Sequence, residues 1–338
     1  MSTVEEPVGD QVEPALTEGS FSKPVLNDAQ QDVLDRLRSV GVVRPAFEPG
    51  LREHLRLELE RGMAPLIELL GEEDLYLSKH KLEQVHGCEG KFLAEEDIPF
   101  EWSVPIARGL VAHRAIEIQI TSRTRWSALD LVDEAIARFQ NDGRGVGEWL
   151  QRATEAEVDM VRAEANNALC SFQDCWPPLA RKWRPATEVP MRAEFFAGRI
   201  VLTGKPDLTI GFPEGQTAGK VVVDFKTGRQ SPAHVADLRF YALLDALRVG
   251  VPPRQLVTYY LDSATMHSEE VTNEILDATV ARTVGAARRI VELRVGEREP
   301  RLAPSAVCSW CPALSTCAVG RAYRADRDEG IGDPDADD

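Results

Sequence analysis

Two aspartates and a lysine stand at or close to the ends of β-rich runs in the second half of the chain. Asp207 follows Gly204-Lys205-Pro206, and Asp224 and Lys226 close the apolar run at 221–223. Residues two apart on a strand face the same side, so Asp224 and Lys226 can point into one pocket. Two carboxylates at one site repel each other unless a cation lies between them, and hard oxygen ligands suit Mg²⁺ or Mn²⁺. The pattern predicts a divalent metal site with a lysine beside it, which are the groups that can assist phosphodiester hydrolysis.

The composition is that of a globular protein whose acidic balance is concentrated at its two ends. The 338 residues are 43% hydrophobic and 28% charged, with a net charge of −16. Residues 1–30 hold six acids and one lysine (−5), and residues 325–338 hold seven acids and one arginine (−6), which leaves −5 for the body. Arginine outnumbers lysine 31 to 8 and is the better bidentate phosphate ligand. The negative charge therefore weakens a nucleic-acid function without excluding it.

No segment of the sequence suggests a membrane or an export route. There is no run near the roughly 20 apolar residues that a membrane span needs, and no basic start followed by an apolar stretch. We therefore expect a cytoplasmic protein with no membrane partner, in which thiols stay reduced. The six cysteines are then expected to be metal ligands or buried thiols rather than disulfides.

The elements that would position the candidate site change in kind near residue 187. Apolar spacing predicts helices at 28–44, 49–71, 78–87, 104–140, 147–182, 232–249 and 270–296. Two strands with a turn at Ala197-Gly198 are expected within 189–212, and further strands at 221–225 and 256–262. The fold class is therefore α/β, with a mixed central β-sheet flanked by helices. The predicted parts are a disordered acidic tail at 1–26, a helical part at 27–186, a core at 187–300, a cysteine segment at 301–324 and a second disordered acidic tail at 325–338.

The order of these motifs resembles the PD-(D/E)XK nuclease superfamily, in its RecB-like branch. The matching residues are Gly204 to Asp207, then Asp224 to Gly228 (DFKTG), then a helix that carries Tyr241. That branch has a histidine on an upstream helix, and GLVAHRAIE places His113 there. The family has a glutamine four residues before the tyrosine, where this chain has Asp237, so the contact of that helix with DNA or with the lysine is in question.

The resemblance implies a restriction-endonuclease-like core and assigns roles to single residues. The implied ligands of Mg²⁺ or Mn²⁺ are His113, Asp207, Asp224 and the carbonyl of Phe225. Lys226 would assist the attack of water on the phosphodiester, and Tyr241 would be a further residue of the catalytic site.

Three cysteines form a tight group near the C-terminus, at Cys308, Cys311 and Cys317. Three thiolates are one ligand short of a tetrahedral metal site or an iron–sulfur cluster. The residues alone leave the fourth ligand open between Cys88, Cys170, Cys175 and a histidine. Zn²⁺ is an alternative to iron–sulfur at this point. Cys170 and Cys175 are expected to be buried or incidental thiols, because their segment has helical spacing of apolar residues.

The cysteine pattern also resembles RecB-like proteins with an iron–sulfur staple, notably the CRISPR-associated single-strand exonucleases and the cluster-bearing helicase–nuclease subunits. In them one cysteine precedes the core and three follow it, and KLEQVHGCEGKF resembles the segment with the early cysteine. The resemblance implies that Cys88 is the fourth ligand of a [4Fe–4S] cluster. We expect a structural cluster, because it would close a loop of more than 200 residues.

By this resemblance the chain is a metal-dependent DNA exonuclease that acts on single-stranded DNA, in DNA repair, recombination or defence. The sequence has no Walker-type Gly-x₄-Gly-Lys-Ser/Thr loop, so a helicase partner would supply any ATP motor. The alternatives are a non-catalytic DNA-binding or assembly module with a nuclease fold, and a zinc-stapled interaction protein.

Overall fold

A computed structural model of the chain describes residues 25–39, 41–96, 98–122, 124, 126–231 and 233–329. Of the two predicted tails, residues 1–24 and 330–338 lie outside the described residues. Residues 325–329, which were also expected to belong to a tail, instead complete helix α12 (Ala318–Glu329).

The elements are predominantly helical before residue 180, and the strands are concentrated between residues 186 and 270. The remaining helices are α1 (Asp28–Arg38), α2 (Leu51–Met63), α3 (Leu66–Leu70), α4 (Lys79–His86), α5 (Glu89–Glu96), α6 (Val104–Thr121), α7 (Ala128–Asp142), α8 (Val146–Arg152), α9 (Glu155–Cys175), α10 (Ala233–Val249) and α11 (Asn273–Arg294). The strands are β1 (Leu75–Leu77), β2 (Ala186–Thr187), β3 (Met191–Phe195), β4 (Ile200–Gly204), β5 (Leu208–Ile210), β6 (Val221–Lys226), β7 (Gln255–Tyr260) and β8 (Thr265–Glu270). Short 3-10 helices lie at Arg181–Trp183, Phe196–Gly198, Ala306–Trp310 and Pro312–Ser315.

The expected mixed sheet is present, and the strands divide between two such sheets. The larger has the order β2-β5-β6-β7-β8, in which only β6 and β7 run parallel. The smaller has the order β1-β4-β3, with β1 parallel to β4 and β3 antiparallel to it. The chain therefore has the α/β fold of mixed sheets flanked by helices, consistent with a restriction-endonuclease-like fold.

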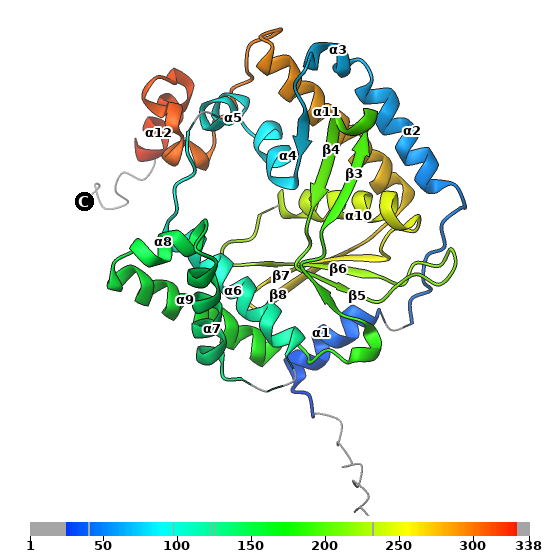
Figure 1. Cartoon of the computed structure of the whole chain (residues 1–338), viewed down its shortest axis with the longest axis vertical. Coiled ribbons are helices and arrows are strands. Elements are labelled where there is room, and N and C mark those ends of the chain that lie inside the picture. Colours follow the sequence, from blue (N-terminus) through cyan, green and yellow to red (C-terminus); the bar gives the residue numbers. More distant parts are fainter. Residues whose placement is uncertain are drawn as a thin grey trace, which may run out of the picture.

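Helices cover both faces of the larger sheet, so its central strands are buried on both sides. Helix α10 packs between the two sheets, whereas α6, α7 and α9 gather on the opposite face of the larger one (Figure 1). Alternate residues of β6 accordingly join different cores: Val222 packs on the α10 side, and Val221, Val223 and Phe225 pack on the α6 side. A strand buried on both faces reads as a continuous apolar run, which explains the sequence of β6.

Several predicted helices are shorter than their apolar spacing suggested, because caps interrupt them. The helix expected at 28–44 ends at Arg38, since Ser39 adopts the left-handed conformation. The one expected at 104–140 is two helices, α6 and α7, because Ser122 is extended and the Ser127 side chain caps α7. Likewise Thr154 caps α9 and separates it from α8. Strands β1 and β8 lie in segments that the sequence analysis assigned to no strand.

Among the residues that the structure describes, no helix combines the length and the apolar character that crossing a membrane requires.

Candidate active site and cysteine pocket

Strand β6 presents Asp224 and Lys226 on the face that α10 covers. Asp224 is 1% exposed, and its two carboxylate oxygens meet two different ammonium groups. The Lys226 Nζ lies 2.8 Å from Oδ2, and the Lys79 Nζ donates a hydrogen bond of 2.8 Å to Oδ1. Burial disfavours the charged carboxylate, but the two lysines outweigh burial and hold the pKa of Asp224 well below its usual range.

Asp207 lies between β4 and β5, and its carboxylate joins α6 to β6. Its Oδ2 accepts a 2.6 Å hydrogen bond from the backbone N–H of Phe225, and its Oδ1 lies 3.0 Å from the Nδ1 of His113. Phe225 thus reaches the site through its backbone, while its ring packs against Phe172 and Trp176 on the other face. Of the predicted metal ligands, His113, Asp207 and the backbone of Phe225 lie together in the structure.

The environment of His113 favours its protonated form in the absence of a bound cation. Burial acts against the imidazolium, but Asp207, with smaller contributions from Asp224 and Glu188, outweighs burial and raises the pKa of His113. An imidazole surrounded by carboxylates is a site that attracts positive charge, whether a proton or a metal ion.

Glu188 is a candidate ligand that the sequence analysis did not single out. Ligand atoms of His113, Glu188 and Asp207 all lie within 4.8 Å of one another. Glu188 follows β2, its φ of 53° is left-handed, and its backbone N–H donates to the Asp207 carbonyl at 3.1 Å. A non-glycine residue held at positive φ is strained, and such strain concentrates at functional sites. Burial raises the pKa of Glu188 despite its ion pair with Lys205.

Lys79 is the second residue that the sequence analysis missed. It is the first residue of α4, where the Ser78 hydroxyl caps the helix by accepting from the Lys81 N–H at 3.4 Å. Burial disfavours the ammonium, but Asp224 and neighbouring groups outweigh it and raise the pKa of Lys79. Neither Lys79 nor Glu188 carries a local signal that could have identified it, because each reaches the site through tertiary packing.

Helix α10 contributes Asp237 and Tyr241 beside the lysines. Asp237, which stands where the sequence resemblance has glutamine, pairs with Lys226 at 3.3 Å from its Nζ. The Tyr241 hydroxyl donates to the Lys205 carbonyl at 3.0 Å. A Cβ on Gly204 would lie 2.7 Å from the Tyr241 ring, so this close approach of α10 to β4 requires glycine. Tyr241 therefore orients the loop that leads to Asp207.

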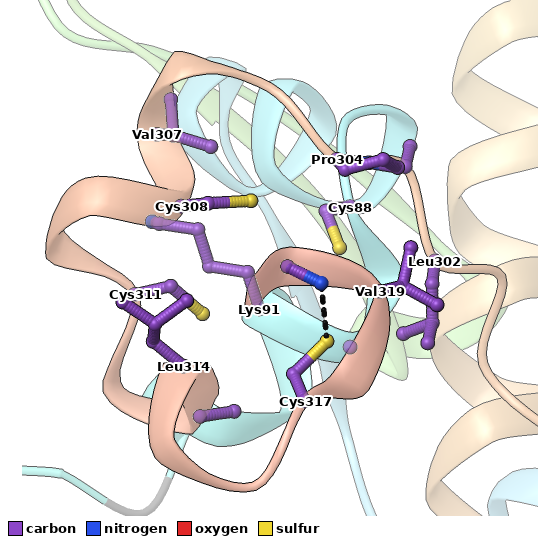
Figure 2. Close-up of a pocket in the computed structure, with 14 residues that line it drawn as sticks. Cys88, Lys91, Leu302, Pro304, Val307, Cys308, Cys311, Leu314, Cys317 and Val319 are labelled. Atoms are coloured by element: carbon purple, nitrogen blue, oxygen red, sulfur yellow. Dashed lines mark hydrogen bonds between the residues drawn. The ribbon is translucent and has the colours of Figure 1, made fainter. Parts of the chain in front are cut away.

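The four cysteines expected to share one cofactor line a single cavity of about 180 Å³. Figure 2 shows the sulfurs of Cys88, Cys308, Cys311 and Cys317 directed into it, the first from the segment before α5 and the others from the C-terminal segment. Cys175 is half-buried in α9 and Cys170 is exposed, and neither lines this cavity. Cys170 is thus not the buried thiol that was one expectation for it.

The lining of the cavity fits a thiolate-bound inorganic group. The Gly320 N–H donates to the Cys317 sulfur at 3.3 Å, and the Ser305 N–H to the Cys308 sulfur at 3.5 Å. A Cβ on Gly320 would lie 3.4 Å from the Cys317 sulfur and 3.6 Å from that of Cys308, so a larger side chain there would fill the cradle. Burial and the neighbouring Cys88 and Cys308 raise the pKa of Cys311, against the opposite effect of Lys91.

Carboxylates, a histidine and lysines gathered at strand ends are the groups that metal-assisted phosphodiester hydrolases use. Residues 76–318 match the family model of the PD-(D/E)XK nuclease superfamily, which is more than two thirds of the chain. The chain therefore belongs to the PD-(D/E)XK nuclease superfamily, and this membership supports nuclease activity with a divalent metal.

Comparisons with individual proteins give more distant similarities. A crystal structure of a "Putative exonuclease" from Eubacterium rectale is 12% identical, with 73% of this chain and 87% of that chain covered and a TM-score of 0.44. The crystal structure of SSO0001 is 16% identical, with 62% of this chain and 94% of that chain covered and a TM-score of 0.29. No curated protein matches the chain.

Proposed function

We propose that this chain is a metal-dependent deoxyribonuclease that removes nucleotides from an end of single-stranded DNA. The observation that carries the proposal is the convergence of His113, Glu188 and Asp207, with ligand atoms within 4.8 Å, next to the Asp224–Lys226 pair. One imidazole and several carboxylates form a donor set suited to Mn²⁺ or Mg²⁺.

The residues of the proposed site have separate roles in phosphodiester hydrolysis. The bound divalent ion would supply charge neutralisation at the phosphate and a lowered pKa for a water molecule. The Phe225 N–H orients the Asp207 carboxylate by a hydrogen bond, so this carboxylate needs little reorganisation to act as a ligand. Asp224 is the shared partner of both lysines, and Lys226 would orient the attacking water.

A nuclease assay tests this proposal directly. Labelled single strands, duplexes and flaps are incubated with the purified protein and Mn²⁺ or Mg²⁺. We expect cutting of single strands from one end, and loss of at least about a hundredfold in Asp207→Ala, because a lost metal ligand removes the charge stabilisation. Asp277→Ala, at an exposed acid of α11, is the matched control and should cut like wild type. Cutting that persists in Asp207→Ala would refute the proposed site.

We propose further that Cys88, Cys308, Cys311 and Cys317 hold a [4Fe–4S] cluster with a structural role. In a tetrahedral zinc site the sulfurs lie about 3.8 Å apart, from Zn–S bonds of about 2.3 Å. The four cysteines line one cavity of about 180 Å³, which has room for a larger cofactor than one ion, and this supports the cluster. Brown protein with absorbance near about 400 nm after anaerobic purification supports the cluster, and a colourless zinc-containing protein refutes it.

The proposed biological settings share one type of substrate. Repair, recombination and defence all present single-stranded ends, and a helicase partner would supply them where the substrate begins as a duplex.

One observation favours the alternative of a non-catalytic DNA-binding module. Both oxygens of Asp224 are paired with lysines, and Asp237 adds an anion beside Lys226 where the family has a neutral glutamine. Asp224→Ala separates the two functions. An enzyme loses Mn²⁺-dependent cutting and keeps DNA binding, whereas for a binding module wild type itself cuts no DNA form with either metal.

A further inference from the structure

A second cavity lies on the α10 face of the larger sheet, next to the candidate active site. Its volume is about 400 Å³, and it lies over β7 and β8 beside the first turns of α10. A cavity of this size and an apolar floor with a few polar groups are typical of a site for a small organic group.

The strand register makes this cavity continuous with the candidate active site. Thr258 and Tyr260, which line it, pair directly with Asp224 and Lys226 of the parallel neighbour β6. Paired residues of adjacent strands point to the same face, about 4.8 Å apart. On the far side, His267 of β8 pairs with Thr258. The cavity therefore begins one strand away from the residues that would act on a phosphodiester.

The lining favours a flat, uncharged occupant. Leu238 and Leu256 are almost fully buried and form an apolar wall with Val235. No lysine or arginine is among the described residues that line the cavity. The carboxylate of Glu269, which does line it, accepts a 2.7 Å hydrogen bond from Arg239. A phosphate would find no cation there, and a sugar would find few polar partners on the apolar wall.

Planar groups with hydrogen-bonding edges stand on the other side of the cavity. The His267 ring lies edge-to-face on Tyr260 with the centroids 5.8 Å apart, and its Nε2 lies 3.1 Å from the Gln230 Oε1. His234 also contacts Tyr260: the two ring centroids lie 5.6 Å apart with the rings tilted by 37°, and the Nδ1 of His234 lies 2.9 Å from the Tyr260 hydroxyl. The exposed His267 and Gln230 are thus the groups that an incoming planar ring can stack on and hydrogen-bond.

We propose that this cavity binds the nucleobase next to the scissile phosphate. The proposal rests on the nucleic-acid substrate of the proposed function and adds a base subsite to it. A nucleobase has apolar faces for Leu238 and Leu256 and a polar edge for Gln230 and His267. A single strand with its phosphate at Asp224 and Lys226 would place a base one strand spacing away, at the cavity.

Val235→Trp tests the subsite by filling it from the surface, because Val235 is 37% exposed. Single-stranded oligonucleotides that carry one abasic nucleotide, moved stepwise from each end, are cut by wild type and by the variant. For wild type, we expect one abasic position to slow cutting about tenfold, the scale of one lost base–aromatic contact. Val235→Trp should slow the intact strand by the same factor and leave that abasic strand unchanged. Leu129→Trp, at a position of α7 that is 41% exposed, should behave like wild type.

A second variant and a binding measurement keep the subsite testable apart from catalysis. His267→Ala changes an exposed residue of the edge strand β8, so it is expected to fold, and it should reduce the discrimination between intact and abasic strands. If wild type cuts no DNA, the proposed function fails. The subsite is then judged by fluorescence anisotropy with the same strands in Ca²⁺. A flat abasic scan in wild type, or equal slowing of intact and abasic strands by Val235→Trp, overturns the base subsite while leaving a nuclease in place.

Discussion

At the scale of single residues, the most unusual group is Asp224, a buried carboxylate held by two lysines. Its pairing with Lys226 follows from their spacing on β6. Lys79, by contrast, lies in helix α4, 145 residues before Asp224 in the chain. The Lys79 ammonium lies at one oxygen of this carboxylate and the Lys226 ammonium at the other, and the two cations offset the cost of burying its charge. The same cations compete with any metal ion that uses an Asp224 oxygen.

Lys79→Met should therefore strengthen the binding of Mn²⁺. Methionine fills similar volume without charge, Lys226 still pairs with Asp224, and Oδ1 becomes free to serve a metal. We expect the dissociation constant for Mn²⁺ to fall about tenfold, the equivalent of about 1.4 kcal/mol. The measurement is a Mn²⁺ titration followed by electron paramagnetic resonance. Lys81→Met, two residues further on α4, is the control, and unchanged or weaker binding in Lys79→Met would contradict the competition.

Glu188→Gln should change the same titration in the opposite direction. Glutamine keeps the shape and the backbone hydrogen bond to Asp207 but removes the ligand charge from the set with His113. Loss of a charged ligand is expected to weaken Mn²⁺ binding at least about tenfold. Glu194→Gln, at an exposed position of β3, should leave it unchanged. Equal affinities in the two variants would remove Glu188 from the site.

At the scale of elements, α4 connects the two sites of the molecule. Lys79 is its first residue, and Cys88 follows two residues after its last, so eight helical residues, or about 12 Å, separate the partner of Asp224 from a cysteine of the pocket. The helix packs against α10 and α11, which fixes its position relative to both sheets. The cysteine pocket and the candidate active site are therefore held by one rigid element.

Gly320→Val should prevent the proposed cofactor from binding in the cysteine pocket without unfolding α12. The added methyl groups would enter the space between the Cys317 and Cys308 sulfurs, where a Cβ already lies 3.4 and 3.6 Å away. We expect loss of most bound iron and of the visible absorbance. Ala322→Val places the same β-branched residue at an exposed position of the same helix and should retain both. Full iron content in Gly320→Val would show that the iron is not held between the Cys308 and Cys317 sulfurs.

The sequence predicted those elements and site residues whose signals are local. The buried run 221–225 and the alternation of Asp224 and Lys226 sufficed for β6, and the spacing of three cysteines sufficed to group them. Strand β1 has only three residues and pairs with β4 across 125 positions of sequence, so no local pattern marks it. Glu188 and Lys79 were missed for the same reason. Each is an isolated charged residue whose partners are supplied by the fold.

At the scale of the whole molecule, one buried carboxylate fastens the C-terminal segment to the rest of the chain. Glu89 is 1% exposed and accepts hydrogen bonds from Arg289 at 3.1 Å, from Arg298 at 2.7 Å and from the backbone N–H of Arg301 at 2.7 Å. It follows Cys88 directly, and the segment that it holds leads to Cys308. The carboxylate therefore brings the two cysteine-bearing parts together independently of any cofactor.

Glu89→Gln should destabilise the protein in a manner that depends on pH. The amide cannot match the charge-assisted hydrogen bonds that the carboxylate accepts from its three partners, so we expect a loss of about 2–3 kcal/mol in the free energy of unfolding at pH 7. The arginine and backbone partners outweigh burial and lower the pKa of Glu89 from its usual 4.5 to about 2. A carboxylate with a lowered pKa contributes its full stabilisation above the unfolded value of 4.5, and the contribution is lost as the pH falls toward 2.

Urea unfolding at pH 7, 4 and 2.5 measures this effect. The gap in the free energy of unfolding between wild type and Glu89→Gln should close as the pH falls. Glu297→Gln, at an exposed position, should show no gap at any pH. A gap of constant size would mean that Glu89 acts through packing rather than through its charge.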